Sequence, residues 1–89
     1  MKLESIHNIN GTDIAVTAEQ RNQFPPSFVL TAKHPKGVTH SQSLTIGDVE
    51  LKNIASLEDA QKFLDAARLE AATVCNKKAA LSEMAAQLK

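Results

Sequence analysis

Hydrophobic and polar residues follow two different patterns along this chain of 89 residues. Up to about residue 54, short apolar-polar alternations are separated by Gly, Pro, Asn and Asp, which is typical of strands joined by turns. From residue 55 onward the chain has no Gly, Pro or His, and Ala, Leu, Lys and Glu dominate, which is typical of a helix. We therefore predict a single α+β domain over residues 1–89, with strands in about 2–52 and one long helix in about 57–88.

Turn signals divide the first part of the chain into the four or five strands of an antiparallel meander. Asn10-Gly11 is the strongest signal, because both central residues of a type I′ hairpin turn need positive φ. The segment His34-Pro35-Lys36-Gly37 fits a type I turn, with Pro second and Gly fourth. Gly47-Asp48 predicts another two-residue hairpin turn, after which Val49 and Leu51 would alternate on a short fifth strand or a strand-like lead-in.

The first four strands are expected at about residues 2–9, 13–18, 27–34 and 38–46. Pro25 and Pro26 should break the chain between the second and third strands, because proline fixes φ and lacks an amide donor. The segment Thr39–Ser43 has no apolar side chain on either face. It is therefore expected at an edge of the sheet, either exposed to solvent or used to recruit a partner.

The predicted helix begins after Ser56, a good N-cap, and Asp59 stands where a capping box needs an acceptor. A helix of this length would span about 45–50 Å, whereas the strands span only about 20–27 Å. Either it overhangs the sheet, or it breaks near Asn76-Lys77-Lys78 and turns back. If it overhangs, two-fold symmetry is the common way to bury its apolar seam, and we predict a homodimer. The predicted dimer-interface residues are Val74, Leu81, Ala85 and Leu88.

The predicted core combines apolar positions of the strands with those that begin the helix. It consists of Ile14, Val16, Phe28, Leu30, Leu44, Ile46, Leu51, Leu57, Phe63 and Leu64.

Charge and composition argue against several classes of function. Ten Lys and Arg balance ten Asp and Glu, whereas proteins that bind nucleic acid usually gather positive charge on one face. Nucleic-acid binding is therefore disfavoured, and it stays an alternative beside a structural or assembly subunit. No stretch approaches the roughly 20 apolar residues of a membrane span, and no apolar signal core is visible. A single Cys is typical of a reducing compartment, so we expect a cytoplasmic protein.

Few side chains suggest chemistry. His7, His34 and His40 are the candidate ligands or bases, but zinc needs three or four ligands and no Cys pair supplements them. Cys75 has no nearby base at a recognisable spacing and is read as a small packing residue. No phosphate-binding loop, dinucleotide fingerprint or nucleophile elbow is present. We therefore expect a non-enzymatic protein with no catalytic residue, cofactor or metal.

What remains is a prediction of a small protein-binding module. Chains of this size are common among accessory proteins of phages and other mobile elements, which suggests an inhibitor or adaptor of a host protein. With the helix assigned to self-association, the loops on the sheet side are left for the partner. The predicted partner-binding residues are Lys33, His34, Lys36 and His40.

Overall fold

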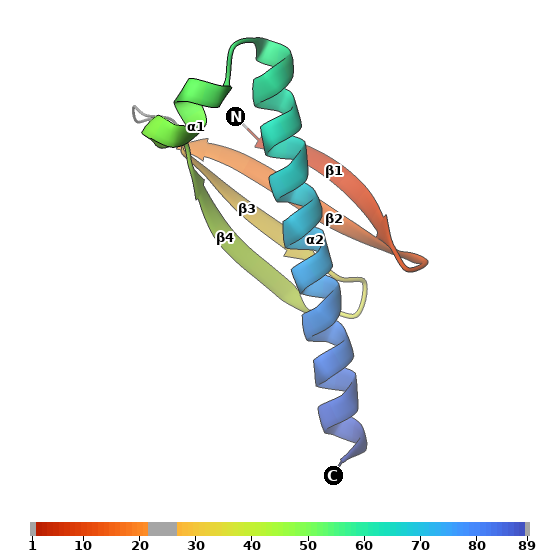
Figure 1. Cartoon of the computed structure of the whole chain (residues 1–89). Helices are drawn as coiled ribbons and strands as arrows, with labels where there is room; N and C mark the ends of the chain where they lie inside the picture. The colour runs from red at the N-terminus through yellow and green to blue at the C-terminus, as the bar shows by residue number, and fades with distance from the viewer. Residues whose placement is uncertain (1, 22–26, 89) are drawn as a thin grey trace.

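A four-stranded antiparallel sheet with one long helix across one face makes up the fold (Figure 1). The computed structural model describes residues 2–21 and 27–88. Its elements are β1 (Lys2–Ile9), β2 (Thr12–Arg21), β3 (Ser27–Lys33), β4 (Thr39–Thr45), α1 (Asp48–Asn53) and α2 (Leu57–Gln87). Each strand pairs with the next along the chain, in the order β1-β2-β3-β4. The predicted α+β meander is confirmed, with four strands, and the predicted break at Pro25 and Pro26 lies outside the described residues.

Two tight turns set the register of the sheet. Asn10 and Gly11 have φ values of 51° and 87°, as a type I′ turn requires. In the β3–β4 hairpin, the Gly37 amide donates to the His34 carbonyl at 2.9 Å, which closes the predicted turn. Both turn predictions are confirmed. The polar segment Thr39–Ser43 lies in β4, at an edge of the sheet, as expected.

The predicted hairpin at Gly47-Asp48 and the fifth strand at Val49 and Leu51 were wrong, because the chain forms α1 there. The Glu50 carboxylate accepts a hydrogen bond from the Gly47 amide at 3.1 Å, and the Asn53 side chain donates to the Val49 carbonyl at 3.1 Å. These local bonds cap a short helix at both ends. Two alternating apolar residues are too short a pattern to separate a strand from a helical turn.

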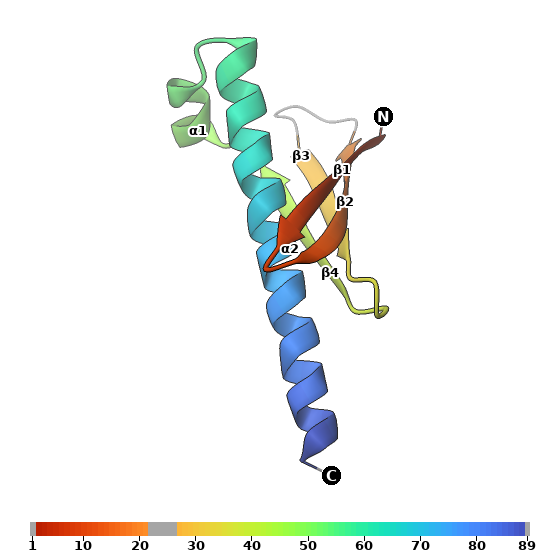
Figure 2. The same ribbon diagram turned by 90° about the vertical axis from the view of Figure 1, so that its right-hand side faces the viewer.

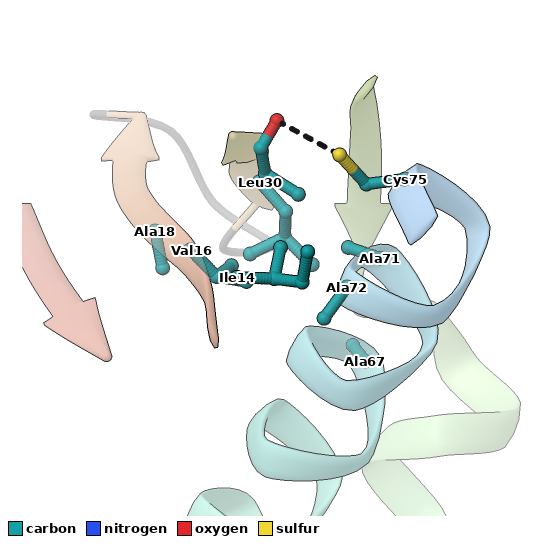
Figure 3. Close-up of a cluster of buried hydrophobic side chains, with 9 residues drawn as sticks. Ile14, Val16, Ala18, Leu30, Ala67, Ala71, Ala72 and Cys75 are labelled. Atoms are coloured by element: carbon teal, nitrogen blue, oxygen red, sulfur yellow. Dashed lines mark hydrogen bonds between the residues drawn. The ribbon is translucent and has the colours of Figure 1, made fainter. Parts of the chain in front are cut away.

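The core lies between the central strands and the middle of α2, and most of it is made of small side chains (Figure 3). The strands contribute Ile14, Val16, Ala18, Leu30 and Ala32, and α2 contributes Ala67, Ala71, Ala72 and Cys75. Because the helix contributes three alanines and a cysteine, its backbone can lie close to the sheet. Because these side chains are small, the layer of buried side chains between α2 and the sheet is thin.

The predicted core is confirmed in its centre and wrong at one end. Ile14, Val16, Leu30 and Ile46 are buried, and Phe28, Leu44, Phe63 and Leu64 are half-buried. Leu51 and Leu57, however, are 41% and 74% exposed. Leu51 lies on α1 instead of a strand, and Leu57 begins α2 at the end of the molecule where that helix rises past the strands (Figure 1).

The long helix is continuous, so the alternative in which it breaks near Asn76 is wrong. It begins as predicted, with the Ser56 hydroxyl accepting from the Asp59 amide at 3.2 Å. The Asp59 carboxylate in turn accepts from the Ala55 amide at 3.1 Å. Residues 80–88, here called the overhang, are all exposed and extend past the sheet (Figures 1 and 2).

Candidate functional site

An apolar cavity of about 510 Å³ lies where the sheet, α1 and the first turns of α2 meet; we call it the end cavity. Its apolar lining consists of Leu3, Phe28, Leu44, Ile46, Leu51, Ile54, Leu57, Ala60, Phe63 and Leu64. The other described lining residues are Gln20 and Gln61. Its size falls in the usual range of binding pockets, which are mostly apolar with a few polar groups.

The end cavity forms because the N-terminal part of α2 does not pack closely on the sheet. The first buried residue of this helix is Ala67, ten positions after it begins at Leu57. Of the side chains before Ala67, Leu64 packs against the edge of the core and also lines the cavity, and Leu57, Ala60 and Phe63 line the cavity. Leu3, at the rim, is 42% exposed, and it joins the exposed Leu51 and Leu57 in one apolar patch. Exposed apolar patches of this kind commonly mark interaction sites.

The chemistry of the end cavity suits binding. Among the described residues that line it, none is Cys, His, Ser, Thr or a charged residue. Carboxylates lie nearby: Asp48 and Glu50 in the first turn of α1, and Glu58 and Asp59 in the first turn of α2. Only Lys52 and Lys62 offset these four acidic residues between positions 48 and 62, which gives this segment a net charge of −2. The segment that includes α1 and the first turns of α2 is therefore acidic.

A second, smaller groove of about 340 Å³ runs between α1 and α2; we call it the α1–α2 groove. Its described lining consists of Val49, Glu50, Asn53, Ile54, Asp59, Lys62 and Phe63. Val49 is 71% exposed. Ile54 and Phe63 also line the end cavity, so the groove and the cavity adjoin each other. In Figure 2, α1 lies on the side of α2 that faces away from the sheet.

Two predicted partner-binding residues, His34 and Lys36, are engaged within the β3–β4 turn and with α2. The Lys36 ammonium forms an ion pair with Glu83 at 2.8 Å, and the Lys36 amide donates to His34 Nδ1 at 3.1 Å. The hydrogen bond from Lys36 lowers the pKa of the Glu83 carboxyl. Both side chains of this ion pair are exposed, so it ties the hairpin to α2 only weakly.

His40 also contacts α2. Its Nδ1 is 2.8 Å from the Lys78 ammonium, and its Nε2 is 2.9 Å from the Gln42 side-chain oxygen. Since an ammonium can only donate, His40 Nδ1 is the acceptor in the contact with Lys78. Lys33 follows the buried Ala32 in β3 and is exposed on the opposite face of the sheet. The four predicted partner-binding residues therefore do not form one surface.

The predicted dimer-interface residues lie along α2 and are largely accessible. Leu81 and Leu88 are 59% and 79% exposed, Ala85 is exposed, and Val74 is half-buried. Met84, which the sequence analysis did not include, is 53% exposed in the same stretch. The homodimer stays a prediction at this point.

Cys75 lies in the core and not in a reactive site. Its single thiol proton has two possible acceptors, the Val38 carbonyl at 3.4 Å and the Ala32 carbonyl at 3.7 Å. Figure 3 marks the second of these contacts. Burial raises the pKa of this thiol above its usual value. A thiol that stays protonated is a poor nucleophile, in agreement with its reading as a packing residue.

Within residues 2–21 and 27–88, no group of three or more His, Cys, Asp or Glu side chains is arranged to hold a metal ion. None of the described helices combines the length and the apolar character needed to cross a bilayer. Comparisons with known protein families, curated proteins and solved structures found no match to this chain.

The sequence analysis missed the end cavity. The available signal was the surplus of large apolar residues around positions 44–64, which one short helix face cannot bury. We had assigned these residues to a closed core because the pattern does not reveal that α2 diverges from the sheet.

Proposed function

We propose that this protein is a non-enzymatic binding module that recognises another protein through the end cavity, as an inhibitor or adaptor does. The observation that carries the proposal is the cavity itself, an apolar space of about 510 Å³ with three exposed leucines at its rim. Leaving this surface in water is unfavourable, and a partner that covers it gains the free energy of burial.

The lining and its surroundings suggest the chemistry of the partner. Apolar walls with two neutral amides fit apolar side chains, which a helical or extended segment of a protein can insert. The acidic residues around the cavity favour basic residues on both sides of that apolar segment. The expected ligand is therefore an amphipathic segment with apolar anchors flanked by Lys or Arg.

The end cavity is a stronger candidate than the β3–β4 hairpin for binding a foreign protein. Lys36 and His40 already contact Glu83 and Lys78, so a partner would have to compete with these internal contacts. The rim leucines, by contrast, are exposed within the described part of the chain.

A set of matched variants tests the proposal. The wild-type protein would serve as bait in a lysate of its source cells, and any retained protein would be identified, purified and titrated by calorimetry. The cavity variant is L51D/L57D, which changes exposed rim residues and should leave the fold intact. The controls are L81D, an equally drastic change on the overhang, and K33E/K36E on the hairpin.

The purified partner should bind the wild type, L81D and K33E/K36E with similar affinity, and L51D/L57D at least about tenfold more weakly. Circular dichroism would verify that all variants are folded. A partner that still binds L51D/L57D, or that loses affinity only for K33E/K36E, would overturn the cavity as the recognition site. Wild-type protein that retains no partner would count against the proposed function.

A further inference from the structure

The outer surface of α2 carries a regular stripe that the sheet does not cover. Its members follow one another at spacings of three or four residues, which places them on one face of a helix. They are Asp59, Phe63, Ala66, Glu70, Thr73, Lys77, Leu81, Met84 and Leu88. We call this set the outer stripe. The buried residues of α2 lie on a different face, toward the sheet.

Two charged residues, Glu70 and Lys77, stand near the middle of the outer stripe. Both are exposed. Neither belongs to the ion pairs of the described residues, which are Lys36–Glu83, Lys62–Glu58 and Arg68–Asp65. Seven residues of helix separate the two by about 10 Å, too far for them to pair within one chain. The middle of the stripe therefore presents one negative and one positive charge, equally far from its midpoint between Thr73 and Val74. Asp59, the remaining charged member, lies at the start of the helix, where its carboxylate accepts from the Ala55 amide.

This arrangement is self-complementary when two helices run antiparallel. If the midpoints coincide, Glu70 of one copy lies opposite Lys77 of the other, and symmetry repeats the pair. The same register places Ala66 opposite Leu81, and Phe63 opposite Met84. In a parallel pair each charged residue would instead meet its own copy, and like charges would repel.

The antiparallel register also brings together the two unpartnered ends of the molecule. Met84 and Leu88 of one copy reach the α1–α2 groove of the other, where Phe63 and the exposed Val49 lie. A pairing confined to the overhang would use only about three turns of each helix, whereas stable interfaces bury more than about 1,000 Å². The antiparallel pairing uses nearly the full length of α2, a helix of 31 residues.

We propose that a second copy of this chain covers the outer stripe, in an antiparallel homodimer held by two symmetric Glu70–Lys77 ion pairs. The interface keeps Leu81 and Leu88 of the sequence-based prediction and places Val74 and Ala85 at its border. Ile54 and Phe63 line both the α1–α2 groove and the end cavity, so the two surfaces adjoin each other. The dimer is argued from the charges and spacing of the outer stripe, however, and does not depend on the proposed function.

Charge reversal tests the register by sedimentation. The wild type should sediment with twice the 9.6 kDa chain mass at micromolar concentration. E70K or K77E alone replaces two attractive pairs with two repulsive ones and should weaken the dimer about tenfold. The double variant E70K/K77E restores opposite charges across the interface and should recover most of that loss. In a parallel dimer, residue 70 would face residue 70 and residue 77 would face residue 77. The single and double variants would then all keep like charges opposite each other, and the double variant would not recover dimer affinity.

Cross-linking provides a second test that does not depend on affinity. On a C75A background, E70C protein mixed with K77C protein should form a disulfide-linked heterodimer on mild oxidation. Either protein alone should stay largely uncross-linked.

Two variants of exposed leucines test whether dimerisation depends on the outer stripe in particular or on exposed apolar surface in general. L81D should sediment as a folded monomer. L57D, which removes an exposed leucine of the same helix outside the outer stripe, should remain a dimer. A wild type that stays monomeric, a dimer unaffected by E70K and K77E, or cross-linking of E70C with itself would overturn the proposal.

Discussion

Truncation of Leu30 tests whether the thin core described above holds the fold together. Leu30 is fully buried in β3, one of the two central strands, and it belongs to the same cluster as Ala71 and Ala72 of α2. Leu30→Ala removes three buried carbons and leaves a cavity. Its helix neighbours are already small and the backbones already close, so we expect little collapse into that space. The cost should therefore reach about 3–4 kcal/mol, within the range for buried leucines.

That loss is large for a chain of this size, whose free energy of unfolding is expected at roughly 4–13 kcal/mol. Urea denaturation followed by circular dichroism at one fixed protein concentration would measure it. The matched control is Leu69→Ala on α2, where the side chain is 50% exposed and the cost should stay below about 1 kcal/mol. A cost for Leu30→Ala below about 1.5 kcal/mol, or equal costs at the two leucines, would refute this account of the core.

Three further predictions concern α2. Ala71→Leu should lower the free energy of unfolding by about 1–3 kcal/mol in urea melts, because the Ala71 methyl group is fully buried, whereas Ala80→Leu on the overhang should change it by less than about 0.5 kcal/mol. Ser56→Ala should cost about 1 kcal/mol in the same assay, because the Asp59 amide loses its acceptor. Because burial raises the pKa of Cys75 above 9.0, the unfolded chain loses its thiol proton first as pH rises. Cys75 should therefore make wild-type stability fall above about pH 9, by at most about 1.4 kcal/mol per pH unit, and the slope should be shallower in Cys75→Ala; equal slopes would contradict the assignment.

The sequence predicted correctly those features that depend on interactions between residues close together in the chain. Asn10-Gly11 predicts its turn because few other residue pairs tolerate positive φ at both positions. Ser56 predicts the start of α2 because its hydroxyl satisfies an amide that the helix leaves free. Length alone reduced the outcomes to two, an overhang or a break near Asn76, since a helix rises by a fixed amount per residue and the strands are shorter. The structure shows the first of these.

Predictions failed where packing between distant segments decides the outcome. The apolar residues Leu51 and Leu57 were assigned to the core because apolar side chains are usually buried, but burial depends on how closely α2 approaches the sheet. That distance is set by Ala67, Ala71 and Ala72 in the middle of the helix, where contact is close, and not by the larger residues before them. The end cavity follows from this difference along the helix and cannot be recognised from periodicity.

The exposed apolar side chains share one physical origin. A helix of 31 residues meets strands of 7–10 residues, so its middle covers the sheet and both of its ends extend beyond the buried cluster. One end leaves Leu57 exposed beside the end cavity, and the other leaves Leu81 and Met84 in water. If a second copy covers the outer stripe, it reaches the end cavity only at Phe63, and Leu3, Leu51 and Leu57 at the rim lie outside the stripe. Self-association and recognition of another protein would then depend on different leucines, so Leu81→Asp should remove the first function and spare the second.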